Sequence, residues 1–506
     1  MTASALAAKV VAQLGETRLV VVANREPYIH LKHADRPGLM GRLVGRKPRE
    51  RMTWIQPASG LVTALDPVMR ACGGVWVAHG SGSGDRDTAD AQGRVAVPPD
   101  DPSYTLRRVW LSEREEEGYY YGLSNSALWP LCHIAYARPV FEEPDWREYV
   151  EVNRRFADVV LEEIADTKAI VFVQDYHFAL LPRMVKAARP DAVVCQFWHI
   201  PWPNAEAFRI CPWKEQILDG LLGNDLLAFH LQYHCNNFLD TVDRTLEARV
   251  DRDLFAVHRG GHRTFVKPFP ISIDPGLWTP VAVGPDWARD VAATRRALAI
   301  GEARLVMGVD RLDYTKGIPE RLQAFERMLD TRPDWRGRVV FLQIGAPTRD
   351  RLDRYQTLGT EVLAQVNAIN ARFGTRQWTP VIFRNEHHSP EQVGALYRAS
   401  DVCVVSSLHD GMNLVAKEFI AARSDEMGVL VLSQFTGAAR SLADVVPVNP
   451  FATDEFAGAI HEALDMPEAE QQRRMRNLRL EVLSHTVYDW AGHLLAEACR
   501  LADGTR

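Results

Sequence analysis

Two short motifs in the second half of the chain place charged residues where a binding site would need them. The first runs from Arg311 through Lys316 to Gly317, and the second runs from Asp410 to Glu418. Each follows an apolar run typical of a buried strand and precedes a helical pattern, and open α/β sheets bind their ligands at such positions. Cations and the amides at a helix start suit phosphate groups, whereas carboxylates suit hydroxyls. Together the two motifs predict a site for a phosphorylated sugar.

Each of these residues also has a structural interpretation that the sequence alone leaves open. Arg311 and Lys316 can be surface cations in weak ion pairs. Asp410 can simply cap the helix that follows it. Glu418 lies among apolar residues within that helix, so its carboxylate needs a partner, and a ribose diol is a suitable one.

Polar side chains also follow strand-like runs in the first half of the chain. Asp175 and His199 each come shortly after such a run, and Arg25 follows the earliest one. A lone His is more often a hydrogen-bonded core residue than a ligand, and Asp175 can be a strand-end cap. Tyr120 and Trp129, taken alone, are equally typical of a protein core. The pattern supplies no convincing metal site, so no metal or cofactor is expected, and sugar hydroxyls are the more natural partners.

The composition argues against several broad classes of protein. A chain of 506 residues, 46% of them hydrophobic, is expected to form two or more soluble domains. The net charge of −6 argues against a broad nucleic-acid-binding surface, and no apolar stretch is long enough to span a membrane. The seven cysteines include no C-x-x-C pair, and the N-terminus lacks an uninterrupted apolar signal region. We therefore expect a cytoplasmic protein with buried, reduced thiols, and the sequence leaves open whether it forms a homo-oligomer.

Short apolar runs alternate with longer helical patterns along the whole chain. This alternation predicts parallel sheets in doubly wound α/β domains. The expected strands are residues 19–23, 169–173, 193–197, 226–229, 305–309, 339–344, 402–405 and 429–432. A proline-rich stretch predicts a boundary near Pro275, between domains of residues 1–275 and 276–480. An amphipathic helical segment, residues 481–506, is expected to pack back on the first domain.

Two further segments have local features without a firm function. The basic stretch from Arg36 to Arg51 is more typical of a solvated loop than of a flap over phosphates. The run Gly-Ser-Gly-Ser-Gly at residues 80–84 is more typical of a flexible turn than of a phosphate loop.

Several longer motifs resemble those of trehalose-6-phosphate synthases, which are retaining glycosyltransferases of the GT-B type. The resemblance extends over residues 19–486, nearly the whole chain. The motifs that carry it are S-N-S-A-L-W-P at 124–130, D-Y-H at 175–177, H-I-P at 199–201, R-L-D-Y-T-K-G-I-P-E-R at 311–321, D-G-M-N-L-V-A-K-E at 410–418 and V-L-V-L-S-Q-F-T-G-A-A at 429–439.

The resemblance implies two Rossmann-like domains that face a cleft, and it implies a role for each donor-site residue. Arg311 and Lys316 would hold the donor diphosphate, and Glu418 would bind the nucleotide ribose. Asp410 would contact the hydroxyls of the donor glucose, and His199 would lie beside the transferred sugar. The remaining implied donor contacts come from Gly60, which lets a loop close over the phosphates, and from the backbone of Asn413, Leu414 and Val415.

The resemblance also implies an acceptor and a reaction. Arg25, Tyr120, Trp129 and Arg349 would line the acceptor phosphate site, and Asp175 would contact the acceptor sugar. Glucose would move from a nucleoside-diphosphate glucose, with UDP-glucose expected, to glucose 6-phosphate, giving α,α-trehalose 6-phosphate. The leaving phosphate would draw the proton from the acceptor hydroxyl during front-face attack, and no metal would be needed.

The chain departs from the family pattern at a few positions. Ser59 stands where the family usually has a glycine, His79 where it has a second tryptophan, and His409 where it has an arginine. Residues 24–28 partly resemble glucosylglycerol-phosphate synthases, which use glycerol 3-phosphate, so the acceptor and the nucleotide base (UDP, ADP or GDP) stay open. A non-catalytic sugar-phosphate sensor is disfavoured, because the cations that stabilise a leaving group are intact.

Overall fold

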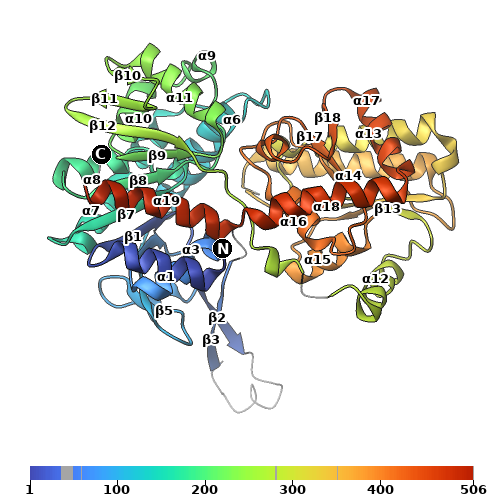
Figure 1. Cartoon of the computed structure of the whole chain (residues 1–506), viewed down its shortest axis with the longest axis horizontal. Helices are drawn as coiled ribbons and strands as arrows, with labels where there is room; N and C mark the ends of the chain where they lie inside the picture. Colours follow the sequence, from blue (N-terminus) through green and yellow to red (C-terminus); the bar gives the residue numbers. More distant parts are fainter. Residues whose placement is uncertain (36–48, 58–59, 280–281, 350, 505–506) are drawn as a thin grey trace, which may run out of the picture. The chain divides into compact units, whose positions relative to one another are not determined.

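The computed structural model describes residues 1–35, 49–57, 60–279, 282–349 and 351–504 (Figure 1). The chain forms two compact units. The first unit comprises Met1–Cys132, Arg138–Phe269 and Ala491–Arg506, and the second comprises His133–Ala137 and Pro270–Trp490. Most of the basic stretch, residues 36–48, and Ser59 lie outside the described residues, so their expected roles stay predictions.

The second unit is built around a fully parallel sheet. Its strands, in the order in which they lie side by side, are β15 (Val381–Arg384), β14 (Val339–Ala346), β13 (Arg304–Arg311), β16 (Val402–Val405), β17 (Val429–Ser433) and β18 (Val446–Val448). The chain starts at β13, moves outward to β15, and then returns to β16 on the other side of β13. The carboxyl ends of β13 and β16 therefore flank a topological switch point, where doubly wound sheets bind ligands.

Helices cover both faces of this sheet. One group of neighbours is α13 (Ile318–Thr331), α14 (Asp353–Phe373) and α17 (Thr453–Asp465). The other group is α12 (Pro285–Ala297), α15 (Pro390–Ala399), α16 (Leu414–Ala422) and α18 (Glu468–Ser484). In Figure 1, α13 and α17 lie above the sheet, whereas α12 and α15 lie below it. Because both faces are covered, β16 and β17 are buried at every residue, which explains their continuous apolar runs.

The first unit also has a mostly parallel sheet. Its strand order is β10 (Arg249–Asp251), β11 (Ala256–Arg259), β12 (His262–Pro268), β9 (Leu226–Phe229), β8 (Val193–Phe197), β7 (Ala169–Gln174), β1 (Arg18–Ala23), β4 (Val75–His79), β6 (Tyr104–Val109) and β5 (Arg94–Val97). The strands from β12 to β6 are parallel, and the edge strands β10, β11 and β5 pair in antiparallel fashion. From β1 the chain moves to β4 and β6, then returns to β7 on the other side of β1. This sheet therefore has its switch point between the carboxyl ends of β1 and β7.

The helices of the first unit connect these strands. They are α1 (Ala3–Leu14), α3 (Gly60–Cys72), α4 (Asp85–Thr88), α5 (Glu113–Glu116), a π-helix η1 (Glu117–Leu128), α6 (Trp129–His133), α7 (Glu143–Ile164), α8 (Leu181–Ala188), α9 (Ala205–Phe208), α10 (Lys214–Leu221) and α11 (Gln232–Thr245). The last helix, α19 (Val487–Ala502), begins after a break at residues 485–486 that separates it from α18. Within the first unit, Glu497 of α19 forms an ion pair with Lys267 of β12, and its Oε1 lies 2.6 Å from the Lys267 Nζ.

The predicted strands and the α/β class are confirmed, and the structure adds short strands that the sequence pattern did not reveal. The added strands include β4, β15 and β18, of which β15 and β18 form the edges of the second sheet. The seven cysteines are free thiols, and six of them are buried, whereas Cys72 is only partly buried. Among the helices in the described part of the chain, none is long and apolar enough to cross a membrane.

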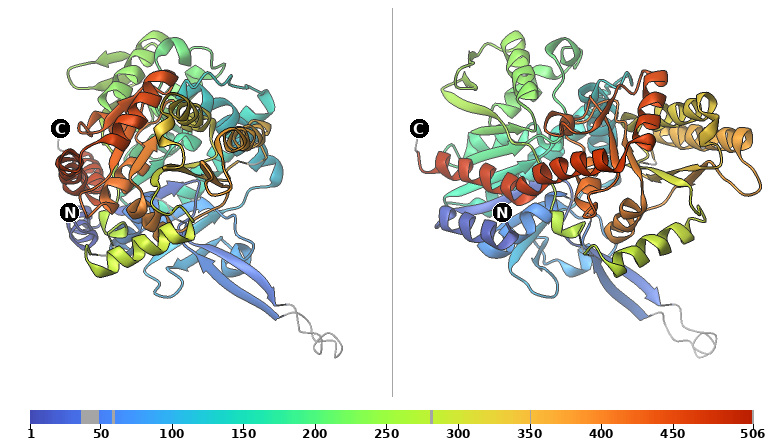
Figure 2. Two further views of the ribbon diagram at one scale, coloured as in Figure 1. Left: turned by 90° about the vertical axis from the view of Figure 1, so that its right-hand side faces the viewer. Right: turned by 45° about the vertical axis from the view of Figure 1, so that its right-hand side comes forward.

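A hairpin projects from the first unit. Its strands are β2 (Ile29–Asp35) and β3 (Arg49–Ile55), and Figures 1 and 2 show it extending away from the sheet. At its base, buried Arg108 pairs with Glu26 and with Asp85 at 2.8 Å each. Gly82 of the glycine run packs so tightly that an added Cβ would lie 2.4 Å from the His30 carbonyl oxygen. Gly82 is therefore required for packing against the hairpin, which is a structural role.

A buried arginine ties together the carboxyl ends of three strands in the second unit. Arg321 of α13 is fully buried, and its Nη2 lies 2.8 Å from Asp310 Oδ2 in β13. Its Nη1 donates to Gln343 Oε1 of β14 at 3.0 Å, and its Nε donates to Ser406 Oγ, after β16, at 2.9 Å. Since a buried charge needs its full set of partners, this network fixes the three strand ends relative to one another.

We expect Arg321→Met to destabilise the second unit by about 3–5 kcal/mol, because it leaves the Asp310 carboxylate buried without its cation. The measurement is urea unfolding followed by tryptophan fluorescence. The matched control is Arg327→Met in the same helix, whose ion pair with Asp454 is exposed and should contribute less than about 1 kcal/mol. Equal losses in the two variants would contradict the role given to Arg321.

Candidate active site

Lys316 and Asp410 meet at the switch point of the second sheet. Lys316 ends a short 3-10 turn, Tyr314–Lys316, that follows β13, and Asp410 follows β16. Their Nζ and Oδ2 atoms are 2.5 Å apart, and both side chains are less than 15% exposed. The two motifs predicted from sequence therefore come together, and they do so through a partly buried ion pair.

The first motif owes its conformation to a glycine. Gly317 has φ of 63°, the left-handed region that favours glycine, and it precedes α13. A Cβ at this position would lie 2.2 Å from the carbonyl oxygen of Ser406. The hydroxyl of Ser406 in turn donates to the Gly317 carbonyl at 2.8 Å. This close approach of two backbones joins the end of β16 to the turn that carries Lys316.

The second motif is organised by Asn413 rather than by Asp410. Asn413 is the N-cap of α16, where its Oδ1 accepts from the Ala416 amide at 3.2 Å. Its Nδ2 donates to Asp410 Oδ2 at 3.2 Å, which orients the carboxylate toward Lys316. The N-cap interpretation of Asp410 is therefore wrong for this helix. Leu414 and Val415 lie in the first turn, where backbone N–H groups have no partner within the helix and can bind an anion.

The charges around this ion pair fix the ionisation of Asp410. Desolvation of Asp410 opposes its ionisation, but Lys316 and Asn413 outweigh that effect and hold the pKa of the carboxyl below its ordinary value. Asp410 is therefore a carboxylate over the whole working range of pH. It can accept hydrogen bonds from hydroxyl groups without a change of protonation.

Glu418 differs from Asp410 in its ionisation. It lies one turn into α16, half-buried, and accepts a hydrogen bond from the Tyr397 hydroxyl at 3.2 Å. Desolvation raises the pKa of Glu418 to about 7, although the Tyr397 hydrogen bond acts in the opposite direction. A diol that donates two hydrogen bonds would favour the ionised form, so Glu418 suits the ribose role expected for it.

Arg349 lies in the second unit, close to the first motif. Its Nη1 lies 3.2 Å from Asp313 Oδ2 and donates to the Tyr355 hydroxyl at 2.7 Å. Burial of Asp313 opposes its ionisation, yet Arg349, Arg311 and Lys316 together lower its pKa. Arg349 is thus part of the cationic cluster around Asp313, and its expected contact with an acceptor phosphate stays a prediction.

His409, one of the departures from the family pattern, has a structural partner in the same unit. Its Nδ1 lies 2.6 Å from the backbone carbonyl oxygen of His133, to which it donates. Burial lowers the pKa of the His409 imidazole, so the ring is neutral near pH 7. His409 therefore contributes a hydrogen bond to the segment 133–137 rather than a charge.

In the first unit, Arg25 and Tyr120 line one cavity. The cavity has a volume of about 270 Å³, and its lining also includes His79, Glu26 and Tyr119. The Tyr120 ring stacks on His177, with centroids 5.7 Å apart and planes 9° apart. Two of the expected acceptor residues are therefore brought together beside the end of β1, and the departure at His79 lies in the same cavity.

Asp175 and His199 also lie together, at the carboxyl ends of β7 and β8. The His199 amide donates to Asp175 Oδ1 at 3.1 Å. Trp129 is buried near Tyr176, with ring centroids 6.0 Å apart, but neither Trp129 nor Asp175 is among the described residues that line the cavity at Arg25. Gly60 is the first residue of α3, directly after residues that are not described.

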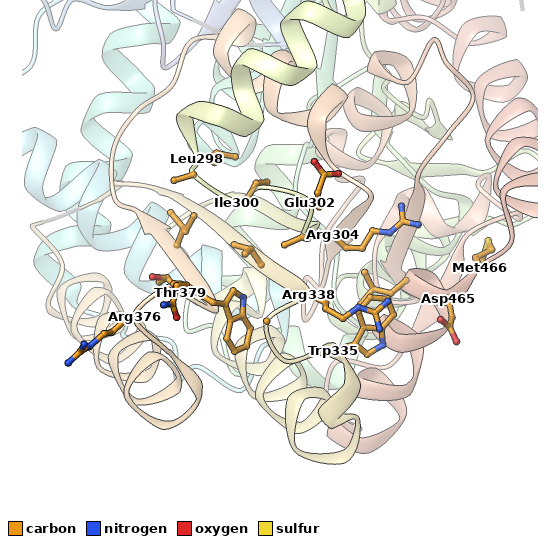
Figure 3. A pocket seen from close by; sticks show the side chains of 18 residues that line it. Leu298, Ile300, Glu302, Arg304, Trp335, Arg338, Arg376, Thr379, Asp465 and Met466 are labelled. Carbon is orange, nitrogen blue, oxygen red and sulfur yellow. The ribbon is translucent and has the colours of Figure 1, made fainter.

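A larger cavity at the opposite edge of the second sheet contains neither motif. It has a volume of about 760 Å³ and lies where β13 and β14 begin (Figure 3). Its lining includes Arg304, Trp335 and Arg338. The carboxyl ends of α12 and α17 adjoin this edge, since Leu298 and Asp465 also line the cavity, and Arg304 is paired with Asp401 at 2.7 Å. The size of a cavity is therefore a poor guide to the chemistry of this chain.

Several residues that shape the site were not singled out from the sequence. Arg321 lies inside the motif at residues 311–321, but its partners are distant in sequence. Asn413 was expected to contribute its backbone, whereas its side chain caps α16 and contacts Asp410 from a backbone with φ of 80°. Tyr397 and Gln174 lie outside the motifs that follow β13 and β16. No group of three or more His, Cys, Asp or Glu side chains in the described ranges is placed to hold a metal ion.

Comparison with known proteins extends over nearly the whole chain. A model of glycosyltransferase family 20 matches residues 17–500. The trehalose-6-phosphate synthase of Mycobacterium marinum is 39% identical over 488 residues, which cover 95% of this chain and 93% of that protein.

Solved structures are similar at the level of the fold and of the sequence. An E. coli trehalose-6-phosphate enzyme bound with UDP-2-fluoro glucose has a TM-score of 0.82 and 29% identity, covering 96% of this chain and 99% of that one. A UDP-forming α,α-trehalose-phosphate synthase from Burkholderia xenovorans in complex with glucose-6-phosphate has a TM-score of 0.79 and 29% identity, covering 95% and 99%. The GT-B fold class expected from the sequence is confirmed.

We expect Tyr397→Phe to raise the pKa of Glu418 above its value of about 7, because the lost hydroxyl stabilises the ionised carboxylate. Carbon-13 NMR of labelled glutamate side chains, titrated from pH 5 to 9, measures the shift. Tyr355→Phe is the control, since Tyr355 contacts Arg349 and Asp313 instead of Glu418. An unchanged or lowered Glu418 pKa in the Tyr397 variant would contradict the assignment.

Proposed function

The chain belongs to glycosyltransferase family 20, and we propose that it transfers glucose from UDP-glucose to glucose 6-phosphate, giving α,α-trehalose 6-phosphate and UDP. The observation that carries the proposal is the Lys316–Asp410 ion pair beside the first turn of α16. Here the Lys316 cation and the backbone amides of α16 can bind a diphosphate, and the Asp410 carboxylate can bind sugar hydroxyls.

The donor half of the reaction uses the second unit. Arg311 and Lys316 neutralise the charge that develops on the departing diphosphate, and amides of Leu414 and Val415 assist. Asp410 accepts hydrogen bonds from the glucose, and Glu418 accepts them from the ribose. The glycosidic carbon passes through an oxocarbenium-like state, which the nearby Asp410 carboxylate stabilises electrostatically.

The acceptor half uses the first unit. Arg25 and Tyr120 bind the acceptor phosphate from one cavity, while Asp175 contacts the sugar and His199 lies beside the transferred glucose. The acceptor hydroxyl attacks the face that the phosphate leaves, and its proton passes to the departing phosphate oxygen. The configuration at the anomeric carbon is therefore retained.

The direct experiment combines a donor panel with an acceptor panel. Purified protein is incubated with UDP-, ADP- or GDP-glucose and with glucose 6-phosphate or glycerol 3-phosphate, and both the released nucleotide and the sugar product are measured. We expect UDP-glucose and glucose 6-phosphate to give the fastest turnover. Faster turnover with glycerol 3-phosphate would show that this compound, and not glucose 6-phosphate, is the acceptor. Binding without turnover would show that the protein is a sugar-phosphate sensor and not an enzyme.

We expect Lys316→Ala to lower kcat by about 10²–10³, the usual loss when a preorganised charge contact in the transition state is removed. Steady-state kinetics with saturating substrates measures it. Arg304→Ala is the control: it breaks an ion pair with Asp401 of 2.7 Å at the opposite edge of the same sheet and should leave kcat unchanged. A Lys316→Ala enzyme with normal kcat would show that leaving-group stabilisation lies elsewhere.

We expect Arg25→Ala to raise the KM for glucose 6-phosphate about 10- to 100-fold, since a charge-assisted hydrogen bond contributes roughly 1.5–3 kcal/mol. The KM for the nucleotide sugar should stay the same. Arg147→Ala, which removes an exposed cation paired with Glu143, controls for the loss of one charge from the first unit. If only the KM for the nucleotide sugar changed, Arg25 would be assigned to the donor site instead.

A further inference from the structure

Asp410 has four polar atoms, and three of them are engaged within the second unit. Its amide donates to the Phe435 carbonyl oxygen at 3.1 Å, and its carbonyl oxygen accepts from the Gly437 amide at 3.0 Å. Its Oδ2 lies 2.5 Å from the Nζ of Lys316. Within the described part of the chain no hydrogen bond reaches Oδ1, and the side chain keeps 14% of its surface exposed. Oδ1 is therefore the atom of Asp410 that a ligand can bind.

The backbone of Asp410 is held by the segment that follows β17. Thr436 pairs with Asp410 in an isolated parallel bridge. Gly437 lies so close to the same loop that an added Cβ would be 2.0 Å from the carbonyl oxygen of Gly411. The end of the motif at residues 429–439 therefore fixes the backbone from which the Asp410 carboxylate projects.

Two neutral donors join Lys316 at Oδ2 of Asp410. Asn413 Nδ2 donates to this oxygen at 3.2 Å, and the Ser407 hydroxyl donates to it at 3.3 Å. Asn413 Nδ2 also donates to Ser407 Oγ at 3.3 Å, so the three polar side chains are hydrogen-bonded in a ring. Ser407 and Asn413 are both buried, so water does not replace these bonds.

The direction of each bond in this ring follows from the chemistry of the groups. Asn413 Oδ1 accepts from the Ala416 amide at 3.2 Å, and a backbone N–H can only donate, so the other end of the Asn413 side chain carries its N–H groups. The Asp410 carboxylate can only accept. The Ser407 hydroxyl therefore accepts from Asn413 and gives its own proton to the bond with Asp410.

These two neutral donors decide which oxygen a ligand meets. With Lys316 as its only partner, the carboxylate could turn about its Cβ–Cγ bond and bring Oδ1 to the cation as well. A ligand hydroxyl would then compete with Lys316 for that oxygen. Because Ser407 and Asn413 hold Oδ2 in place, Oδ1 keeps its capacity to accept a hydrogen bond. One free oxygen suits one sugar hydroxyl, whereas two free oxygens could bind a diol.

We propose that Ser407 is a positioning residue that, together with Asn413, keeps Lys316 on Oδ2 of Asp410 and presents Oδ1 to one hydroxyl of the donor glucose. The proposal rests on the proposed function and deepens it, since its ligand is a nucleoside-diphosphate glucose. Ser407 is fully buried and acts through the carboxylate, not by contact with the sugar. Loss of its hydroxyl should therefore weaken the binding of the nucleotide sugar and spare that of the nucleotide.

The first test compares a nucleotide sugar with the nucleotide alone. Isothermal titration calorimetry measures the Kd of the full-length protein for UDP-glucose and for UDP. In Ser407→Ala we expect the Kd for UDP-glucose to rise about 10-fold, the contribution of one hydrogen bond to a charged group, and the Kd for UDP to stay the same. Equal weakening of the two ligands would overturn the proposal, because the fault would then lie in the diphosphate site.

The second test identifies the hydroxyl. Analogues of UDP-glucose that each lack one hydroxyl of the sugar are titrated into the wild-type protein and into Ser407→Ala. We expect one analogue to bind both proteins equally, because it lacks the hydroxyl that Oδ1 accepts, whereas the other analogues keep the difference of about 10-fold. A difference that persisted with every analogue, or that vanished with two of them, would overturn the assignment of Oδ1 to a single hydroxyl.

A second variant, Asn413→Gly, removes the other neutral donor from Oδ2. Glycine readily adopts the φ of 80° found at this position and is accepted as an N-cap, so α16 should still form. We expect this variant to weaken UDP-glucose more than UDP, as Ser407→Ala does. Equal binding of UDP-glucose by Asn413→Gly and the wild type would show that the neutral donors do not position the carboxylate.

The matched control is Ser400→Ala, which lies just before β16, whereas Ser407 lies just after it. Ser400 is also buried, and its hydroxyl donates to the Leu396 carbonyl oxygen at 2.7 Å. This variant loses a comparable hydrogen bond, so its melting temperature should fall about as much as that of Ser407→Ala. It should bind UDP and UDP-glucose as the wild type does. A selective loss of UDP-glucose in both variants would reduce Ser407 to a packing residue.

Binding of the nucleotide sugar needs neither an acceptor nor turnover, so the two proposals fail separately. If Ser407→Ala lost UDP-glucose selectively but the wild type made no trehalose 6-phosphate, the function would be disproved and the role of Ser407 would stand. If the wild type made trehalose 6-phosphate and Ser407→Ala bound UDP-glucose equally well, the function would stand and the role of Ser407 would be disproved.

Discussion

The ion pair between Lys316 and Asp410 is the interaction on which the proposed donor site of the second unit depends. A cation and an anion in contact, in a partly buried place, favour a ligand that offers groups to both. A free phosphate would approach Lys316 but also meet the Asp410 carboxylate, and a neutral sugar would hydrogen-bond to the carboxylate alone. A glycosyl phosphate satisfies both, because it brings an anion and hydroxyls a few ångströms apart. Gly317, Asn413 and Arg321 serve to hold the two charged side chains at this point.

The two units solve the same geometric problem with different chemistry. Both sheets have a switch point, and both use polar residues that follow its strands. In the second unit these residues are ionised, with a carboxylate at Asp410 and cations at Arg311 and Lys316. In the first unit the strand ends β7 and β8 add neutral hydrogen-bonding groups, the Gln174 amide and the His199 imidazole. The switch point of the second unit thus offers an ion pair, whereas that of the first unit combines the Asp175 carboxylate with uncharged hydrogen-bonding groups.

The sequence predicts the central strands well because burial on both faces requires an easily recognised apolar pattern. A strand such as β17, buried at every residue, must be a continuous apolar run, whatever its neighbours are. The edge strands β15 and β18 are harder to recognise in the sequence, since β15 is buried only at its first residue. The two motifs were found for a related reason: each lies directly after a central strand, so its place in space follows from its place in the chain.

The residues that sequence reasoning missed share another property. Arg321 lies in an amphipathic helix and resembles a surface cation, yet it is fully buried, because Asp310, Gln343 and Ser406 converge on it from three strands. A single sequence shows no sign of that convergence. Gln174 likewise resembles an ordinary strand residue until β8 brings His199 beside it. What a residue bonds across a sheet depends on strand order, and strand order is the part of the fold that periodicity does not encode.

Glucose transfer with retention makes two opposed demands on the departing phosphate, and under the proposed function the Lys316–Asp410 ion pair meets both. The phosphate must be stabilised as an anion, yet it must stay basic enough to take the acceptor proton. Isolated cations would meet the first demand and defeat the second, because they lower the basicity of the oxygens they contact. Lys316 shares its charge with Asp410, so the net positive field on the phosphate is moderate.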